Sequence, residues 1–540
     1  MFLRSDRNKF FLSAFVIFLF FTIFLAISDY FSIGLLSDDY LNFISAKNST
    51  LLQKFTSSIQ NYSNFHLRPF WFLSIVNSIN LNEMLGFEKS NFIFFRIENL
   101  IYFYILTLLI SYLLFKVTGN YIYSIILLLF CLMYPNNLND ICWTVGKVDI
   151  LCAIFMFAAL YVTYSFCEKN SDLKIAICLL FFLLALLTKE SSVILPFISI
   201  IIIYISFGRE KLHEIKYLIF LEFFLLILYF AYRIIILGTQ PVEVVTAYQN
   251  PGIIYSVGVI FKASVSMLIP FDYLSIQDNL DLLNRNFLIY LIVSFSFLVT
   301  LLFIFSTTKS IGKLFLICLV FLSSILPNLI AGYFRPQLIL IPFVLIAFTT
   351  ALVLFKLKYY YKFFLITILA LLINWGIIGY KLVKNWDYSY DVAEKVYAEF
   401  MNLDLDATKK NVILGLPSRL RQSYIMDYAI GPYNYYRHNE FEVKDKFFDL
   451  VYIGALDSGS LNSELFVKKI SDNEFEIYTT GETQYFMRLD AYSNKYKDRD
   501  LILKMTEENI FNKPTVMYLR ILTENVNIIL YSEGKFRKLN

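Results

Sequence analysis

Histidine and cysteine are scarce in this sequence, and their scarcity excludes several common metal sites. The 540 residues include three histidines and six cysteines, with no HExxH motif and no CxxC pair. A zinc site built on histidine or on paired cysteines is therefore not expected. The six cysteines lie in or beside apolar runs, so we expect small core residues rather than disulfides.

Charge is also sparse. Charged residues make up 17% of the chain and the net charge is +4, so no nucleic-acid partner is expected. Apolar residues make up 58%, well above the share of a soluble protein, and runs of membrane-spanning length recur. The sequence thus predicts a polytopic α-helical membrane protein. Its bias toward Phe, Ile, Asn, Lys and Tyr is typical of an AT-rich bacterial genome, so we expect the bacterial inner or plasma membrane.

The positions of basic residues predict the topology. The first apolar run, 10–27, lacks a small-x-small cleavage site, so we expect a retained span rather than a signal peptide. Segment 253–269 is apolar enough to cross, but Lys262 and several serines interrupt it. If it lies at the outer interface instead, the clusters of Lys and Arg between the other runs all fall on one side. We therefore expect about eleven spans and a cytoplasmic N-terminus. The remaining spans are expected near 92–115, 121–134, 150–166, 173–187, 191–207, 215–237, 287–307, 312–330, 335–355 and 361–380.

Two domains are expected. Residues 1–383 would form the transmembrane domain, with a large first outer loop at 28–91. Residues 384–540 are mixed and charged, without long apolar runs, and would form a soluble α/β domain on the outer face. Its segment 391–403 has helical spacing. Short strands are expected at 411–417, 449–456, 475–480, 515–522 and 526–532.

Polar and charged residues gather at the expected outer ends of the spans. Placing a charged side chain at membrane depth costs on the order of 2.5–3.5 kcal/mol, so charges at such positions indicate a functional or structural role. Together they would form a cationic ring with carboxylates opposite, which suits an anionic ligand such as a lipid-linked phosphate. They are Asp38, Asp39, His66, Arg68, Arg96, Glu98, Asn99, Asp140, Trp143, Lys147, Asp149, Lys189, Glu190, Arg233 and Arg335.

Each feature also has a simpler interpretation. Lys189 and Glu190 could be an ion pair at a helix end, and Asp38 and Asp39 a solvated helix cap. Arg68 and Arg335 could extend toward lipid headgroups. Trp143 could be an interfacial anchor. The order of these residues along the chain, rather than any one of them, favours a shared site.

That order resembles the GT-C superfamily of glycosyltransferases, which use polyprenyl- or dolichyl-phosphate sugars. The resemblance covers residues 10–380 and rests on five short segments: an acidic pair after the first span, "RPFWFLSIVNSIN", "WTVGKVDIL", "LLTKESSVILP" and "YRIIILG". "WTVGKVDIL" resembles the Trp-x-x-Gly-Arg-x-Asp-Leu-Leu stretch of the protein O-mannosyltransferase branch that carries tetratricopeptide tails. Lys147 stands where that branch has arginine.

The chain departs from that branch at several positions. Arg96 and Tyr134 stand where histidines are usual, and the acidic residue expected near Tyr134 aligns with Asn139 rather than Asp140. The tetratricopeptide tail is absent, so the acceptor of that branch is not carried over.

The resemblance implies an inverting transfer of a sugar from a polyprenyl-phosphate donor to an acceptor hydroxyl. The acceptor would be a glycan, a lipid or a protein. A carboxylate would accept the hydroxyl proton, with Asp38 the first choice and Asp39 the second. Cationic residues would hold the leaving phosphate, namely Lys147, Lys189, Arg335 and Arg68. Residues that orient these groups would be Asp149, Glu190, Trp143 and Asp140.

No cofactor is required by this chemistry. Adjacent carboxylates and a phosphate offer oxygen ligands that a divalent cation could use, but the basic residues can neutralise the same charge, so no metal is expected. Membrane lipid and the lipid-linked donor are the expected partners. The alternatives are a transporter or flippase for a lipid-linked glycan, a polysaccharide polymerase or ligase, and a catalytically inactive scaffold. A transporter would favour internal repeats, and none is evident.

Overall fold

We describe a computed structural model of the chain. Its described residues are 2–56, 67–87, 92–237, 260, 263–264, 266–267, 311–331, 336–355, 361–403, 405, 408–426, 447–455, 465–481, 484–487, 495–508 and 514–539. His66, Arg335, the expected span 287–307 and most of 253–269 lie outside these residues.

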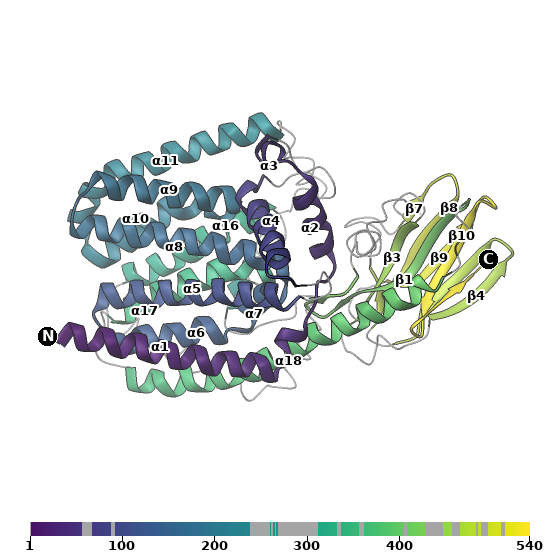
Figure 1. Ribbon diagram of the computed structural model, residues 1–540, viewed down its shortest axis with the longest axis horizontal. Coiled ribbons are helices and arrows are strands. Elements are labelled where there is room, and N and C mark those ends of the chain that lie inside the picture. Colours follow the sequence, from purple (N-terminus) through teal and green to yellow (C-terminus); the bar gives the residue numbers. More distant parts are fainter. Residues whose placement is uncertain are drawn as a thin grey trace.

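Long helices lie side by side and form a bundle (Figure 1). The apolar runs are helical because, in a bilayer, each backbone polar group must be bonded within its own segment. The bundle helices are α1 (Phe2–Ile27), α5 (Ile93–Thr118), α6 (Tyr121–Met133), α8 (Lys147–Glu168), α9 (Asp172–Thr188), α10 (Leu195–Phe207), α11 (Arg209–Leu237), α16 (Ile311–Ala331), α17 (Leu340–Phe355) and α18 (Tyr361–Met401).

In the described part of the chain, five helical segments are long and apolar enough to cross a membrane. They are Asp6–Ile27, Ile93–Thr118, Thr144–Glu168, Glu190–Phe207 and Arg209–Ile236. A sixth is reached if α6 and the short α7 (Pro135–Cys142), which are bent by 59° at Tyr134, count as one span. The chain is therefore a helical membrane protein, as predicted. Helices α9, α16, α17 and α18 coincide with further expected spans, and the count of eleven stays a prediction.

Basic residues gather at one end of the bundle. Lys116, near the end of α5, lies 2.7 Å from Glu168 at the end of α8. Lys9 of α1 lies 5.7 Å from the Tyr121 ring at the start of α6. Lys169 and Lys174 follow in the α8–α9 connection and the first turn of α9. We call this the basic end and the opposite one, next to the β-sheets in Figure 1, the sheet end.

The first loop is folded against the sheet end (Figure 1). It contains the 3-10 turn η1 (Tyr30–Ser32) and helices α2 (Asp38–Asn48), α3 (Leu51–Thr56) and α4 (Pro69–Met84). Three further 3-10 turns lie between bundle helices: η2 (Thr144–Gly146), η3 (Glu190–Ile194) and η4 (Pro336–Ile339). Among the described residues of the first loop, Tyr30, Tyr40 and Phe43 have no exposed surface.

Helix α18 links the bundle to the sheets. It runs without a break for 41 residues, about 60 Å, and ends beside β1 (Figure 1). The expected domain boundary at 383/384 falls inside this helix. Lys384 contacts Asp29 and Asp387 accepts a hydrogen bond from Ser32, so the middle of α18 is fastened to the end of α1 and to η1.

The described residues of the C-terminal region form two sheets. The six-stranded sheet has the order β11-β10-β1-β3-β6, with β2 paired to β1, and β1 is parallel to both β10 and β3. The five-stranded sheet has the order β4-β5-β9-β8-β7 and is antiparallel. The strands are β1 (Lys410–Leu420), β2 (Ser423–Tyr424), β3 (Phe447–Ala455), β4 (Leu465–Ser471), β5 (Glu474–Thr479), β6 (Tyr485–Phe486), β7 (Lys495–Lys497), β8 (Leu501–Glu508), β9 (Pro514–Ile521), β10 (Val526–Ser532) and β11 (Lys535–Lys538).

Strand β1, at the centre of the six-stranded sheet, is buried on both faces. Val412 and Leu414 of β1 pack with residues of the five-stranded sheet. Ile413 and Leu416 belong to the core that continues into the helical bundle. Successive side chains of a strand point to opposite faces, so an almost wholly apolar strand such as "NVILGL" suits this position. All five predicted strands are present.

Candidate active site

The adjacent aspartates open helix α2, where their charge is favourable near the helix N-terminus. Asp39 has no exposed surface. Its Oδ2 accepts from the Leu36 N–H and its Oδ1 from the Val145 N–H, both at 3.0 Å. Burial raises the pKa of Asp39 to about 6, while Arg96 and the two backbone N–H groups oppose the rise. The sequence left open that Asp39 is a solvated helix cap. Its complete burial excludes that interpretation.

Asp38 lies in a different environment from its neighbour. It is partly exposed, and its Oδ1 accepts a hydrogen bond of 3.0 Å from the indole Nε1–H of Trp143. Ser37, just before it, has φ 52° and ψ −123°, a conformation that a residue with a side chain rarely adopts. Strain of this kind costs on the order of 1–3 kcal/mol and often occurs at functional sites. Asp38 and Asp39 are consecutive residues of α2, so their side chains leave the helix in different directions and meet different surroundings.

Arg96 fastens the first loop to α7. Its side chain has no exposed surface and donates to the carbonyls of Ile33, Gly34, Ile141 and Cys142. A guanidinium has five N–H donors in a fixed plane, so one arginine can satisfy several carbonyls that a buried loop would otherwise leave unbonded. Arg96 therefore has a structural position rather than one that faces a ligand.

The Trp143–Lys147 segment packs closely on α7. The Asn99 amide donates to the carbonyls of Trp143 and Thr144 at 3.3 and 3.2 Å. A Cβ atom on Gly146 would lie 2.6 Å from the carbonyl oxygen of Asp140. Only glycine allows this approach, which explains the glycine in "WTVGK".

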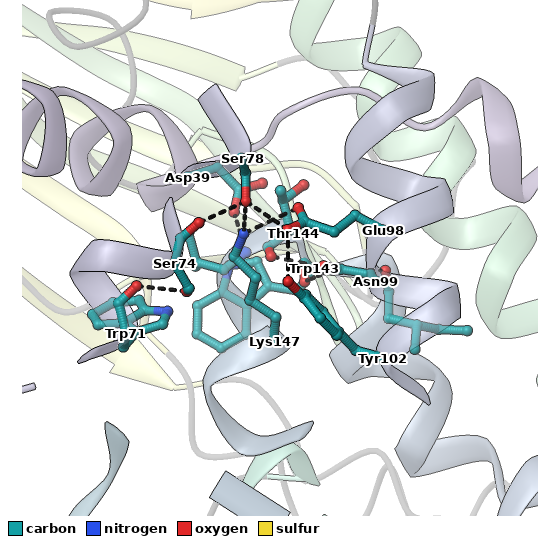
Figure 2. Close-up of polar contacts among 12 residues, drawn as sticks. Asp39, Trp71, Ser74, Ser78, Glu98, Asn99, Tyr102, Trp143, Thr144 and Lys147 are labelled. Atoms are coloured by element: carbon teal, nitrogen blue, oxygen red, sulfur yellow. Dashed lines mark hydrogen bonds and ion pairs between the residues drawn. The ribbon is translucent and has the colours of Figure 1, made fainter. Parts of the chain in front are cut away.

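Lys147 is enclosed within a polar network, shown in Figure 2. Its Nζ lies 3.2 Å from Glu98 Oε2 and also donates to Ser78 Oγ. Ser78 and Tyr102 donate to Glu98 Oε1 at 2.8 and 3.1 Å. The side chain of Lys147 is completely buried. The sequence predicted that Lys147 contacts the donor phosphate. In the structure its amino group is already paired with the carboxylate of Glu98, so a phosphate would have to compete with that carboxylate.

Lys189 has a similar partner. Its amino group pairs with Asp149, and both side chains are almost fully buried. The sequence suggested Lys189 with Glu190, but the ion pair forms with a residue forty positions earlier instead. Asp140 lies within electrostatic reach of this pair. Both of its carboxylate oxygens are buried without a hydrogen-bond partner among the described residues.

Two arginines share Glu190. Arg68 Nη2 lies 2.8 Å from Glu190 Oε2, and Arg233 Nη1 lies 2.9 Å from Glu190 Oε1. The three side chains come from the residue before α4, from η3 and from the last turns of α11, and they are 13–23% exposed. Two guanidiniums around one carboxylate leave a net positive charge at a partly open position. We call these three residues the arginine cluster.

The C-terminal region reaches the same end of the bundle. Tyr424 of β2 lies 5.7 Å from the Trp143 ring and 6.0 Å from the Trp386 ring. Asn139 of α7 accepts from Trp386 Nε1 at 3.0 Å and donates to Gln422. Residues more than 280 positions apart therefore meet beside Asp38.

Sequence reasoning found most of these residues but missed several partners. It placed Asp38, Asp39, Trp143 and the Lys189 region at one end of the membrane domain, and the structure brings them there. It did not identify Ser78, Gln422 or Tyr424, which carry no local signal. Among the described residues, no group of three or more His, Cys, Asp or Glu side chains is placed to hold a metal ion.

A search of protein-family models finds none that matches the chain, and no curated protein matches it at the threshold applied.

Proposed function

We propose that the chain is a membrane glycosyltransferase. It moves a sugar from a polyprenyl-phosphate donor to an acceptor hydroxyl, by inverting displacement, on the outer face of the membrane. One observation carries most of the proposal: the sheet end contains both a partly exposed carboxylate, Asp38, held by Trp143 Nε1–H, and the partly exposed cationic arginine cluster. The resemblance to GT-C enzymes, stated from the sequence, points to the same chemistry.

In this proposal Asp38 is the general base. It accepts the proton of the acceptor hydroxyl as that oxygen forms its bond to the anomeric carbon. The bond from that carbon to the phosphate oxygen breaks, and its electron pair leaves with the polyprenyl phosphate. Such base catalysis is worth about 10²–10⁴-fold. Asp39 is less suited to this role because its two oxygens accept backbone N–H groups and no part of it is exposed.

The arginine cluster takes the leaving phosphate. Arginine can bind a phosphate through two parallel hydrogen bonds, and a positive group stabilises charge as it develops on the leaving oxygen. Glu190 would keep the two guanidiniums apart and oriented. Lys147 and Lys189 are buried and paired with Glu98 and Asp149. In this proposal they would contribute to the electrostatic potential of the site without contacting the phosphate. Arg335 remains a predicted phosphate contact.

The proposed topology has about eleven spans with the basic end in the cytoplasm. The sheet end then faces the outside, where the lipid tail of the donor stays in the bilayer and its head meets an acceptor. The C-terminal sheets would lie on that outer side.

The test is turnover of synthetic polyprenyl-phosphate sugars by the purified protein in lipid nanodiscs, with cell-envelope extract as acceptor. We expect wild type to release polyprenyl phosphate. Asp38→Asn should lower kcat at least a hundredfold while its melting temperature stays close to that of wild type.

Three other outcomes would contradict the proposal. Wild-type activity retained in Asp38→Asn excludes Asp38 as the base. Donor movement across a bilayer without cleavage indicates the flippase. Turnover only of lipid-pyrophosphate glycans indicates a polymerase or ligase.

A further inference from the structure

The short hairpin between β1 and β2 is held firmly against the sheet end of the bundle. The Ser423 hydroxyl lies 2.9 Å from that of Ser389 on α18 and 3.3 Å from the carbonyl oxygen of Asn385. Gln422 accepts from Asn139 of α7. The hairpin therefore contacts both the linking helix and the bent helix that precedes Trp143.

Tyr424 presents its ring to Trp143 from this hairpin. The two ring centroids are 5.7 Å apart with an angle of 44° between the planes, within the range of favourable aromatic pairs. Tyr424 is only 5% exposed. It also lies 6.0 Å from the Trp386 ring and 5.1 Å from the Arg419 guanidinium. The Tyr424 ring thus has little room to move, and it limits the positions open to the indole.

Because the Trp143 indole is held in place, it also restricts the orientation of the Asp38 carboxylate. The same indole donates its Nε1–H to Asp38 Oδ1 at 3.0 Å. A carboxylate on a partly exposed helix N-terminus can rotate about two side-chain bonds, and a hydrogen bond from a fixed donor selects one orientation. A general base works only when it lies within hydrogen-bond distance of the proton it accepts.

We propose that Tyr424 is a positioning residue for the transfer reaction. It fixes the Trp143 indole, and the indole holds Asp38 in the orientation of the base. The C-terminal region is then part of the active site rather than a separate module. This inference rests on the proposed function, with Asp38 as the base.

The experiment compares kcat and the donor KM of the full-length protein in lipid nanodiscs. The substitutions are Tyr424→Ala, Tyr424→Phe and Trp143→Phe, each made in wild type and in Asp38→Asn. Phe536→Ala is the matched control, because Phe536 makes a similar ring contact of 6.0 Å with Phe400 of α18, away from Trp143.

We expect Tyr424→Ala and Trp143→Phe each to lower kcat about tenfold, the size of one lost hydrogen bond to a charged group, with the donor KM unchanged. A Tyr424→Ala/Trp143→Phe double variant should be no slower than Trp143→Phe, since both residues act through one carboxylate. Tyr424→Phe should restore most of the kcat. In the Asp38→Asn background, neither Tyr424→Ala nor Trp143→Phe should lower the residual rate further.

The outcomes separate the two proposals. Wild type that turns over no donor overturns the proposed function and this inference with it. An active wild type with unchanged kcat in Tyr424→Ala overturns the inference alone, as does an equal loss in the Asp38→Asn background or in Phe536→Ala. If Tyr424→Ala does not fold, Tyr424→Leu keeps most of the apolar volume and carries the same expectations.

Discussion

Asp38 and Asp39 are adjacent in the chain but lie in different environments. Asp38 meets an indole N–H and is partly exposed, whereas Asp39 joins the first loop to the backbone of Val145. A carboxylate that bonds two backbone N–H groups inside the protein contributes to folding, and its protonation state affects stability.

The pH dependence of stability should reveal the buried state of Asp39. Its pKa rises from 3.8 to about 6 on folding, so between these pH values the folded chain binds more protons than the unfolded one. The stabilisation by that proton is complete below about pH 4 and is lost as pH rises through 6. Relative to Asp39→Asn, the free energy of unfolding of wild type should fall by roughly 2–2.5 kcal/mol between pH 4 and 7.

Chemical unfolding in detergent, followed over that pH range, measures this difference. Asp391→Asn, at an exposed position of α18, is the control and should keep the wild-type pH dependence. Parallel curves for wild type and Asp39→Asn would show that Asp39 keeps an ordinary acidity in the folded chain.

At the scale of elements, α7 and η2 form the junction on which the site depends. Arg96 and Asn99 of α5 bond carbonyls along this junction, and Asn139 connects it to the C-terminal region. The junction is buried, so its backbone polar groups need these side chains as partners. A change in its packing should therefore affect both stability and Asp38, because Trp143 belongs to it.

Substitution of Gly146 tests this packing. A Cβ at this position would lie 2.6 Å from the Asp140 oxygen and 3.0 Å from the Asp140 Cα, so the backbone of α7 must move. We expect Gly146→Ala to lower the free energy of unfolding by about 1–3 kcal/mol and to reduce turnover. Gly312→Ala is the control, since its Cβ would meet no atom within 4 Å on helix α16. That substitution should be neutral or stabilise by up to about 1 kcal/mol. A Gly146→Ala protein as stable as Gly312→Ala would show that the two segments are less closely packed.

The elements were predictable where a local pattern decides them. "VNIILYS" is apolar enough to predict β10, and the long apolar runs predict the bundle helices. Strand β4, "LFVKKIS", was missed because it lies at a sheet edge, where lysines are tolerated and alternation is lost. The continuity of α18 was also missed. The sequence predicted a span at 361–380 and a separate helical segment at 391–403, whereas one helix runs from Tyr361 to Met401. Trp386, Val396 and Tyr397 of this helix are buried against other parts of the chain.

The site was predictable in its members but not in their pairing. Charged residues at the ends of apolar runs must lie near the membrane surface, so the sequence could place Lys147 and Lys189 there. Their partners depend on which helices are neighbours. Lys147 pairs with Glu98 of α5, and Lys189 pairs with Asp149 rather than the adjacent Glu190. Tyr424 is recognisable only once the hairpin and Trp143 meet in space.

For the whole molecule, the distribution of charge predicts an orientation. Lys9, Lys116 and Lys174 lie at the basic end, while the sheets and Asp38 lie at the other. Basic residues in short loops stay in the cytoplasm during insertion, so the sheet end should face outward. A lipid-linked donor and its acceptor would then meet outside the cell.

Labelling of single cysteines with a membrane-impermeant maleimide tests this orientation. The native cysteines are first replaced; five are buried and Cys318 is exposed. Asp472→Cys, in the β4–β5 turn where the side chain is 96% exposed, should be labelled in intact spheroplasts. Asn170→Cys, in the exposed α8–α9 connection, should be labelled only after permeabilisation. The reverse pattern would place Asp38 in the cytoplasm, where a transferase would need a donor whose sugar faces inward. Labelling of both sites from outside would mean that an even number of spans lies between them. The predicted topology would then be wrong.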